Sequence, residues 1–484
     1  MRLRRSILPV LLLAGALASG GGAAAIEVGA QGDAEPLGGP RPTTPVLSAR
    51  RVPSVVAAPV ADRRLRGDLA AWAGSAHQPS CAVVLDARGQ VVLDHHGDEP
   101  MVPASTLKLL TATAALEALG ADHTYRTVVV GPPPEGGVVR GDLTLVGGGD
   151  PVLVTEDYAA RSPRQPQVHT SMEALADALV SAGVTRVEGS IVGDESRYDQ
   201  QRYLPVWPAR YIDQNQTGPL SALSVNDGFA EYPTPQVHRD LRPAPDPAAH
   251  AAGVLTLLLA ARGVEVVGPP RSGAAPAGEP ELAAVESPPL AEIVRQLLQE
   301  SDNTTAELLV KELGAQAGDP TTAGGLRRLV EVLGAAGLDL TGAAITDGSG
   351  LSTENRVPCR LVLQALVDPE TGPLLRERLA VAGESGTLWR SFLDTSLVGH
   401  LRGKTGRLNA VASLAGTVVD DDGELAFAYL ANDPDGLIDV QAVVSTQATL
   451  AQILLSWPQT PDVTVLGPEP VEPAPQGTGP GGDR

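Results

Sequence analysis

The chain has 484 residues, and at roughly 100–200 residues per domain this length predicts two to four domains. A hydrophobic fraction of 43% and a charged fraction of 19% exclude a chain that is disordered throughout. The 36 Lys and Arg residues against 57 Asp and Glu residues give a net charge of −21. We therefore expect no nucleic-acid partner, because phosphate binding needs a cationic surface.

The N-terminus has the pattern of an export signal. Arginines at the start precede the apolar stretch Ile7–Ala18, and Ala23-Ala24-Ala25 fits a cleavage site. We predict a signal peptide over residues 1–25 and an exported, extracytoplasmic protein, with an uncleaved anchor as the alternative. The stretch is too short for a stable transmembrane span. We expect a linker over residues 26–60 and a disordered tail over residues 458–484, since both are rich in Gly and Pro.

Helical and strand patterns alternate along the rest of the chain, which predicts an α/β fold. Residues 61–120 and 287–457 form the two parts of one domain, an antiparallel sheet flanked by helices. Residues 121–286 contain short alternating runs with frequent Gly and Pro, and are expected to form a large β-rich insertion. Helices are predicted over 62–76, 103–119, 171–182, 249–262, 290–300, 304–313, 326–336, 360–367 and 440–455. The clearest strands are 81–85, 90–93, 410–419 and 424–430.

The two cysteines are far apart in the sequence. Cys81 opens a predicted strand, and Cys359 stands at the start of a predicted helix. In an exported chain an even number of cysteines favours a disulfide, and two buried free thiols are the alternative.

Ser105 and Lys108 lie three residues apart at the start of a predicted helix, hence on one face. A serine hydroxyl needs a base to become a nucleophile, and a lysine can be that base if its pKa is lowered. Arginine cannot fill this role because it stays protonated. Only three of the 36 basic residues are lysines, namely Lys108, Lys311 and Lys404. Taken alone, the Ser–Lys pair is also compatible with an exposed helix face.

Ser301-Asp302-Asn303 separates two predicted helices. A polar turn at this place can project a hydroxyl and an amide into a cleft. Capping of the second helix by Asp302 or Asn303 explains the same residues equally well.

Gly403-Lys404-Thr405-Gly406 precedes the predicted strand 410–419. A phosphate-binding loop needs another glycine five positions before Gly403, where Val398 stands, and a helix after the motif, so we exclude nucleotide binding. None of the eight histidines has the spacing of a zinc site, and no metal is predicted.

S-x-x-K, S-D-N and K-T-G in this order are the motif set of penicillin-recognising enzymes with an active-site serine. Ser301 follows Ser105 by 196 residues, which leaves room for the insertion. From about residue 62 to 456 the chain resembles the class C low-molecular-mass penicillin-binding proteins, the D-alanyl-D-alanine carboxypeptidase/endopeptidase family. Other stretches that look like this family are expected to serve turns and packing; they are 141–151, 189–194, 221–226, 347–352 and 383–388.

The resemblance implies a penicillin-recognising serine transpeptidase-like domain that acts on peptidoglycan peptides without a metal or cofactor. Ser105 would attack the carbonyl between two D-alanines, and Lys108 would take its proton. The N–H groups of Ser105 and Arg407 would hold the oxyanion. Ser301, helped by Asn303, would pass a proton to the leaving D-alanine. β-Lactam antibiotics are then expected as covalent inhibitors.

The resemblance also places the substrate carboxylate beside Lys404, Thr405 and Gly406. The family usually has threonine where this chain has Arg407, a difference that bears on substrate preference rather than on the reaction. Lys311 lies outside the motifs and is expected at the surface.

A serine β-lactamase and a non-catalytic scaffold that binds cell-wall peptides are the alternatives. The long insertion and the lack of an obvious base for fast deacylation disfavour the first, and the complete motif set disfavours the second. The sequence does not separate carboxypeptidase from endopeptidase activity.

Overall fold

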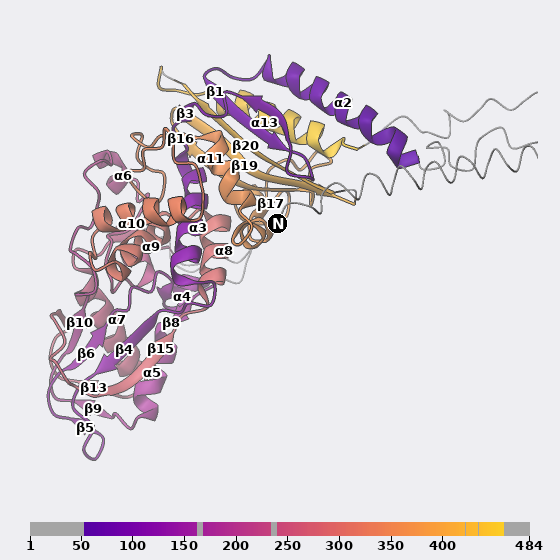
Figure 1. Ribbon diagram of the computed structural model, residues 1–484. Coiled ribbons are helices and arrows are strands. Elements are labelled where there is room, and N and C mark those ends of the chain that lie inside the picture. The colour runs from indigo at the N-terminus through magenta and orange to yellow at the C-terminus, as the bar shows by residue number, and fades with distance from the viewer. Residues whose placement is uncertain (1–52, 162–167, 234–239, 422, 434, 459–484) are drawn as a thin grey trace, which may run out of the picture. The chain divides into compact units, whose positions relative to one another are not determined.

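The structure is a computed structural model that describes residues 53–161, 168–233, 240–421, 423–433 and 435–458 (Figure 1). The predicted signal peptide, and the predicted tail from residue 459 on, lie outside the described residues. Within the described ranges no helix is long and apolar enough to cross a membrane.

Helix α2 (Pro53–Ala73) begins inside the segment that was expected to be a linker, before the helix predicted from Asp62. Pro59 lies within this helix. A proline usually marks a helix end or start, which explains why the sequence pattern predicts a later beginning.

A six-stranded antiparallel sheet forms the centre of the first domain (Figure 1). In spatial order its strands are β17 (Ala380–Val381), β18 (Leu401–Leu408), β19 (Val411–Asp420), β20 (Gly423–Asn432), β1 (Ser80–Leu85) and β2 (Val91–His95). Strand β1 pairs with β20, so the first and the last strand of the described ranges are neighbours in one sheet. The predicted strands 81–85 and 90–93 pair as the hairpin β1–β2, and 410–419 and 424–430 pair as β19–β20. The antiparallel sheet flanked by helices is confirmed as well.

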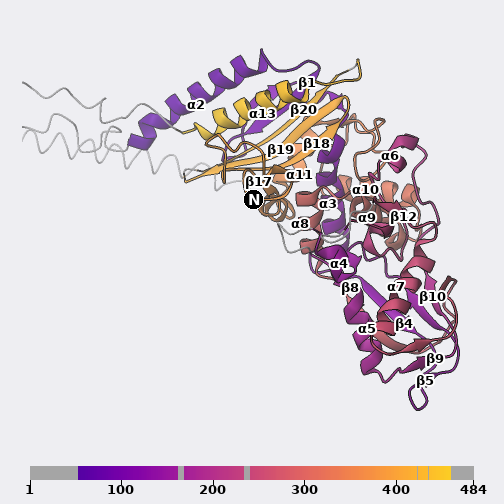
Figure 2. The ribbon, with the colours of Figure 1, turned by 180° about the vertical axis from the view of Figure 1, so that it is seen from behind.

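Helices cover both faces of this sheet (Figures 1 and 2). On one face lie α2 and α13 (Val440–Leu455), where Leu65, Leu69 and Trp72 of α2 are buried as their spacing predicts. On the other face, α11 (Cys359–Val367) contacts β20 and β1. It shares one hydrophobic core with the helices α3 (Lys108–Leu119), α8 (Leu290–Glu300), α9 (Asn303–Gln316), α10 (Thr322–Ala335) and α12 (Gly372–Glu377).

Between α3 and α8 the chain forms a second sheet with a hydrophobic core of its own. Its strand order is β14 (Arg271–Ser272), β10 (Ile191–Asp194), β6 (Leu143–Val146), β4 (Arg126–Val130) and β15 (Glu281–Glu286). Here β10 runs parallel to both of its neighbours, unlike any strand of the first sheet. The two helices predicted in this segment are found as α5 (Met172–Ser181) and α7 (Pro247–Ala261).

Short elements complete the described chain. Three two-stranded sheets pair β3 (Pro100–Met101) with β16 (Val357–Pro358), β7 (Leu153–Val154) with β8 (Thr170–Ser171), and β11 (Phe229–Glu231) with β12 (Arg242–Pro243). A three-stranded sheet has the order β13 (Glu265–Val266), β9 (Arg186–Val187) and β5 (Val138–Val139). The short helices are α4 (Glu156–Ala159) and α6 (Ala209–Asp213), and the 3-10 turns are η2 (Ala104–Leu107), η3 (Asn226–Gly228) and η4 (Gly386–Leu388).

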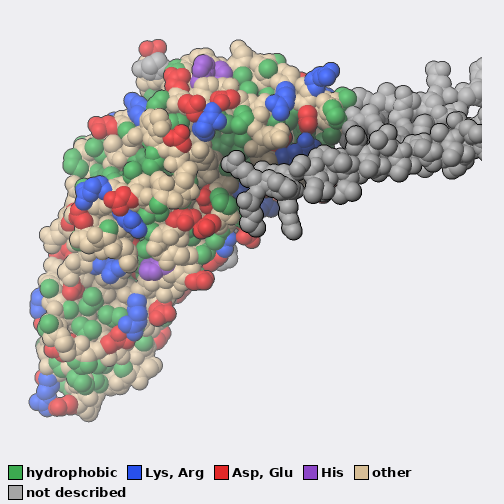
Figure 3. Space-filling model, in the orientation of Figure 1, with side chains coloured by type: hydrophobic (Ala, Val, Ile, Leu, Met, Phe, Trp, Pro, Cys, Tyr) green, Lys and Arg blue, Asp and Glu red, His purple; other side chains and the backbone are tan. Residues whose placement is uncertain are grey.

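Charged side chains of both signs are intermixed on the face shown in Figure 3. In the described ranges, ion pairs join charged side chains of different elements, such as Arg360 with Asp98 at 2.5 Å and Arg262 with Asp177 at 2.6 Å. Basic residues on this face are therefore balanced locally by carboxylates, which does not favour a polyanionic partner.

Lys311 is not a surface residue, and the expectation that it would be exposed is wrong. Its side chain is fully buried on α9 and forms an ion pair with Asp199 of the insertion. The next residue, Glu312, is also buried and receives two hydrogen bonds from Arg197, at 2.6 and 2.9 Å. Two adjacent residues of α9 are thus the charged contacts through which the insertion holds this helix.

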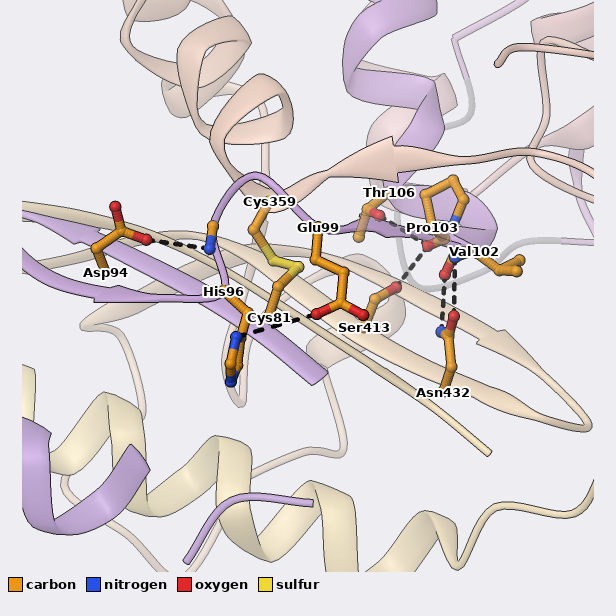
Figure 4. Close-up of a disulfide and its surroundings, with 11 residues drawn as sticks. Cys81, Asp94, His96, Glu99, Val102, Pro103, Thr106, Cys359, Ser413 and Asn432 are labelled. Carbon is orange, nitrogen blue, oxygen red and sulfur yellow. Dashed lines mark hydrogen bonds and ion pairs between the residues drawn. A yellow bond between two sulfur atoms is a disulfide. The ribbon is translucent and has the colours of Figure 1, made fainter. Parts of the chain in front are cut away.

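The structure joins Cys81 of β1 and Cys359 of α11 in a disulfide (Figure 4). Both cysteines are completely buried. They are 278 residues apart, and the whole insertion lies between them. The bond therefore fastens the first part of the sheet to a helix from the second part of the same domain.

We expect the Cys81→Ala/Cys359→Ala double variant to lose about 2–5 kcal/mol of unfolding free energy, because the bond closes a very long loop. Urea unfolding with and without reductant measures this loss. Reductant should lower the midpoint of the wild-type protein and leave that of the variant unchanged. Equal midpoints for the two proteins without reductant would contradict the prediction.

Replacing Asp199 should cost more unfolding free energy than replacing Lys311, its partner in the ion pair. Asp199→Asn leaves a fully buried ammonium without its counter-ion and should cost about 2–4 kcal/mol. Lys311→Met leaves a carboxylate whose side chain is 29% exposed, so we expect a loss below about 1 kcal/mol. Urea unfolding of both variants tests this, and an equal loss in the two would be evidence against a buried, charged Lys311.

Candidate active site

The turn that carries Ser105 is fixed to the central sheet (Figure 4). Val102 N donates to Asn432 Oδ1 at 2.8 Å, and Asn432 Nδ2 donates to Val102 O at 3.0 Å. The next carbonyl, that of Pro103, accepts hydrogen bonds from Thr106 Oγ1 and Ser413 Oγ, both at 2.7 Å. The backbone immediately before Ser105 is therefore held by side chains of β19 and β20.

Two glycines allow other segments to approach Ser105 closely. A Cβ on Gly406 of β18 would lie 2.9 Å from Ser105 N. A Cβ on Gly350 would lie 1.9 Å from Ala104 O, and Gly350 also has a φ of +83°. Any side chain at either position would push the strand or the loop away from the serine. Ala104 itself has a φ of +48°, which is a strained conformation for a residue with a Cβ.

Lys108 begins α3 one turn after Ser105, and its side chain is fully buried. Its Nζ lies 3.1 Å from Ser105 Oγ, 2.7 Å from Asn303 Oδ1 and 2.7 Å from Ser349 O. Burial lowers the pKa of Lys108 to about 8, although the nearby carboxyl groups oppose this shift. The first two motifs, which the sequence places far apart, are joined by this one amine.

Two buried acidic side chains hold the loop that supplies Ser349 O through hydrogen bonds to its backbone. Glu307 Oε1 accepts hydrogen bonds from the N–H groups of Gly348 and Ser349, at 3.0 and 2.7 Å. Asp347 accepts from the N–H groups of Gly350 and Ser352, at 2.8 and 2.6 Å. Burial, followed by the charge of Asp347, raises the pKa of Glu307 to about 8. This loop was expected to serve only as a turn, but its backbone carbonyl contacts Lys108.

The S-D-N motif both caps the helix α9 and lines a cavity. Ser301 ends α8 in a left-handed conformation with a φ of +60°. Asp302 caps α9 by accepting from Thr305 N at 3.1 Å, so the capping interpretation holds for this residue. Asn303 Nδ2 donates to Gln216 O at 2.6 Å, which directs its Oδ1 toward Lys108.

The K-T-G motif precedes β19, as expected, but it lies within a strand of its own, β18, which the sequence pattern did not predict. Its glycines lower the apparent β-propensity and hide the strand. Lys404 is fully buried, and its Nζ donates to Ser301 Oγ at 2.8 Å and to Thr405 O at 2.9 Å. Burial, followed by the charge of Lys108, lowers the pKa of Lys404 well below its usual range.

A cavity of about 490 Å³ opens over these groups. It is lined by Ser105, Gln216, Glu300, Ser301, Asn303, Leu351, Gly386, Thr387, Trp389, Thr405, Arg407 and Leu408. Of the predicted site residues, Lys108, Lys404 and Gly406 lie buried behind this lining and contact it.

Seven lining residues were not predicted as site residues, namely Gln216, Glu300, Leu351, Gly386, Thr387, Trp389 and Leu408. Leu351 and Thr387 belong to stretches that resemble the family, and this was the available signal, although it was interpreted as packing. Thr387 Oγ1 accepts a hydrogen bond from Thr405 Oγ1 at 3.0 Å, so it belongs to the site. Across the described ranges, no cluster of three or more His, Cys, Asp or Glu side chains suited to a metal occurs.

Comparisons with known proteins identify the family of the chain. The model of the D-Ala-D-Ala carboxypeptidase 3 (S13) family matches residues 73–237 and 238–454. A carboxypeptidase of Mycobacterium tuberculosis is 34% identical over 420 residues, covering 82% of this chain and 86% of the relative. A D-alanyl-D-alanine carboxypeptidase of Actinomadura sp. strain R39 is 31% identical over 435 residues, covering 74% and 78%.

The fold is also that of a solved structure. Penicillin binding protein 4 of Haemophilus influenzae superimposes with a TM-score of 0.65 at 21% identity, covering 80% of this chain and 99% of the other. The chain belongs to the D-Ala-D-Ala carboxypeptidase 3 (S13) family, the class C low-molecular-mass penicillin-binding proteins that its three motifs resemble.

Proposed function

We propose that this protein is a serine D-Ala-D-Ala carboxypeptidase/DD-endopeptidase that acts outside the cytoplasm on peptidoglycan stem peptides. The reaction passes through an acyl-enzyme on Ser105, which β-lactams form as well. The buried disulfide and the predicted signal peptide favour an extracytoplasmic location. The observation that carries the proposal is the set of contacts around the amine of Lys108.

A neutral amine has two N–H groups and one lone pair. Asn303 Oδ1 and Ser349 O, each 2.7 Å from Lys108 Nζ, are acceptors only and take the two N–H groups. The lone pair is then left for the third neighbour, Ser105 Oγ at 3.1 Å. This arrangement directs the basic electron pair toward the proton of the nucleophile. Burial makes the neutral form accessible near pH 7, because a pKa of about 8 leaves about a tenth of the amine unprotonated.

The remaining groups fit the later steps. Ser105 Oγ attacks the carbonyl of the penultimate D-alanine while Lys108 takes its proton, and the N–H groups of Ser105 and Arg407 hold the oxyanion. Ser301, hydrogen-bonded to Lys404, passes a proton to the leaving amine. Asn303 keeps Lys108 oriented and offers its amide to the peptide. Water then releases the acyl group and restores Ser105.

Ser105→Ala should abolish covalent labelling by a fluorescent penicillin and lower the release of D-alanine about 10⁴-fold or more, because no other group replaces the nucleophile. Ser445→Ala, at an exposed serine on α13, is the matched control and should keep both activities. Labelling that persists in the Ser105 variant would refute the assignment. A wild-type protein that binds peptidoglycan peptides without labelling would support the scaffold alternative.

The rate of Ser105 acylation should rise with pH and reach a plateau above about pH 8, since a base acts only in its deprotonated form. Below that pKa we expect a fall of about tenfold per pH unit. The measurement is kcat/KM for penicillin acylation between about pH 5.5 and 9.5. A flat profile, or a rate that falls as the pH rises, would rule out Lys108 as the base.

Lys108→Met keeps the length and burial of the side chain but has no basic nitrogen. We expect its acylation rate to fall by about 10³-fold or more over the whole pH range while the protein stays folded.

Turnover of a chromogenic β-lactam by the wild-type protein separates the two hydrolase assignments. A long-lived adduct supports the peptidase, and rapid turnover supports the β-lactamase.

A further inference from the structure

Glu307 and Asp347 are fully buried acidic side chains that hold the loop beside Lys108, and the proposed reaction uses neither of them. Glu307 lies on α9 one turn after Asn303, and Asp347 belongs to the loop itself. Both lie near enough to Lys108 for their negative charge, when present, to raise the pKa of its amine. The number of charges that the two acids carry therefore decides how readily Lys108 releases its proton.

The carboxylate of Asp347 receives hydrogen bonds on both of its oxygens. Its Oδ1 accepts from Gly350 N and from Asn355 Nδ2, both at 2.8 Å. Its Oδ2 accepts from Ser352 N at 2.6 Å and from Trp207 Nε1 at 2.9 Å. These four donors replace the water that a buried carboxylate loses, so this group can stay ionised.

Glu307 has half as many donors, and both of them reach the same oxygen. Its Oε1 accepts from Gly348 N at 3.0 Å and from Ser349 N at 2.7 Å. In the described part of the chain no group donates a hydrogen bond to its Oε2, although this atom is buried. An ionised Glu307 would leave a share of its charge on a buried oxygen without a donor, which is costly. A proton on Oε2 removes that charge and leaves both hydrogen bonds to Oε1 in place.

We propose that Glu307 and Asp347 hold one proton between them, that Glu307 carries it, and that the pair therefore presents a single negative charge to Lys108. This inference rests on the proposed function, in which Lys108 is the base. Two carboxyl groups in one buried site seldom ionise together, because each raises the pKa of the other. Burial, followed by the charge of Asp347, raises the pKa of Glu307, and hydrogen bonds from Ser349 and Gly348 only partly oppose this shift.

Further charged groups lie around the two acids. They are Asp302 and Lys311 of α9, of which Lys311 is paired with Asp199, and Lys404 of β18. The charge of Asp302 also raises the pKa of Lys108, although less than that of Asp347. Lys404 cannot cancel these anions reliably, because burial and the charge of Lys108 lower its own pKa. A second anion at Glu307 would therefore favour the ammonium form of Lys108, which cannot act as a base.

The first measurement is the pH at which penicillin acylation reaches half of its plateau rate. The proteins compared are the wild type, Glu307→Gln and the double variant Glu307→Gln/Asp347→Asn. Glutamine has the shape of a protonated glutamate and keeps an acceptor for both N–H groups. We expect Glu307→Gln to leave the midpoint unchanged, since one neutral group replaces another. The double variant also removes the remaining charge, so its midpoint should fall by about one pH unit or more.

The double variant is needed because Asp347→Asn alone would let Glu307 release its proton and restore the negative charge. Glu354→Gln is the matched control, since Glu354 is an exposed acid that follows the same loop. It should keep the wild-type midpoint.

The second measurement is infrared spectroscopy, which does not depend on activity. A protonated carboxylic acid has a carbonyl stretch apart from the bands of a carboxylate. At about pH 7 the wild-type protein and Glu354→Gln should show one such band that Glu307→Gln lacks. In Asp347→Asn this band should disappear at a lower pH than in the wild type, because the neighbouring charge is gone. This variant identifies the proton even if Glu307→Gln does not fold.

A midpoint that falls by about a pH unit in Glu307→Gln alone would overturn the inference, since Glu307 would then carry a charge in the reactive protein. An unchanged midpoint in the double variant, or the absence of the Glu307 band at about pH 7, would overturn it as well. If penicillin does not label the wild-type protein at all, the proposed function fails, whereas the infrared band still shows whether Glu307 holds the proton.

Discussion

The amine of Lys108 is the point on which the site depends. It is fully buried, yet all three of its polar neighbours are uncharged oxygens. Burial in this cage disfavours the ammonium and lowers the pKa of Lys108, so the neutral form that can act as a base becomes accessible. The cage has a structural cost: the loop 347–352 must be held by buried acids, and Gly350 and Gly406 must stay without side chains.

The insertion contributes to this cage as well as adding a second sheet. Gln216 O fixes the amide of Asn303, and Thr304, the next residue of α9, accepts a hydrogen bond from Gly218 N at 3.1 Å. Two turns further along α9, Lys311 and Glu312 pair with residues 199 and 197. The helix that carries Asn303 is thus held by the insertion at both its beginning and its middle. A shift of the insertion would therefore be felt at Asn303, which contacts Lys108 directly.

The sequence predicted the helices and hairpins of the first domain well, because their apolar periodicity is strong. It also predicted the three motifs, since Ser–Lys spacing and the scarcity of lysine carry chemical meaning. It could not predict that Lys311 is buried, because a lone lysine in a helix shows no sign of a partner 112 residues earlier. Gln216 was missed for a related reason: it contributes a backbone carbonyl to Asn303, and a backbone carbonyl leaves no trace in the residue type.

The buried surroundings of the three lysines decide what their amines can do. All three lysines are buried, and a compact amine meets three oxygens at position 108, two at position 404 and one at position 311. Burial also lowers the pKa at positions 108 and 404. A guanidinium at those positions would bring five donors and a charge that it cannot lose.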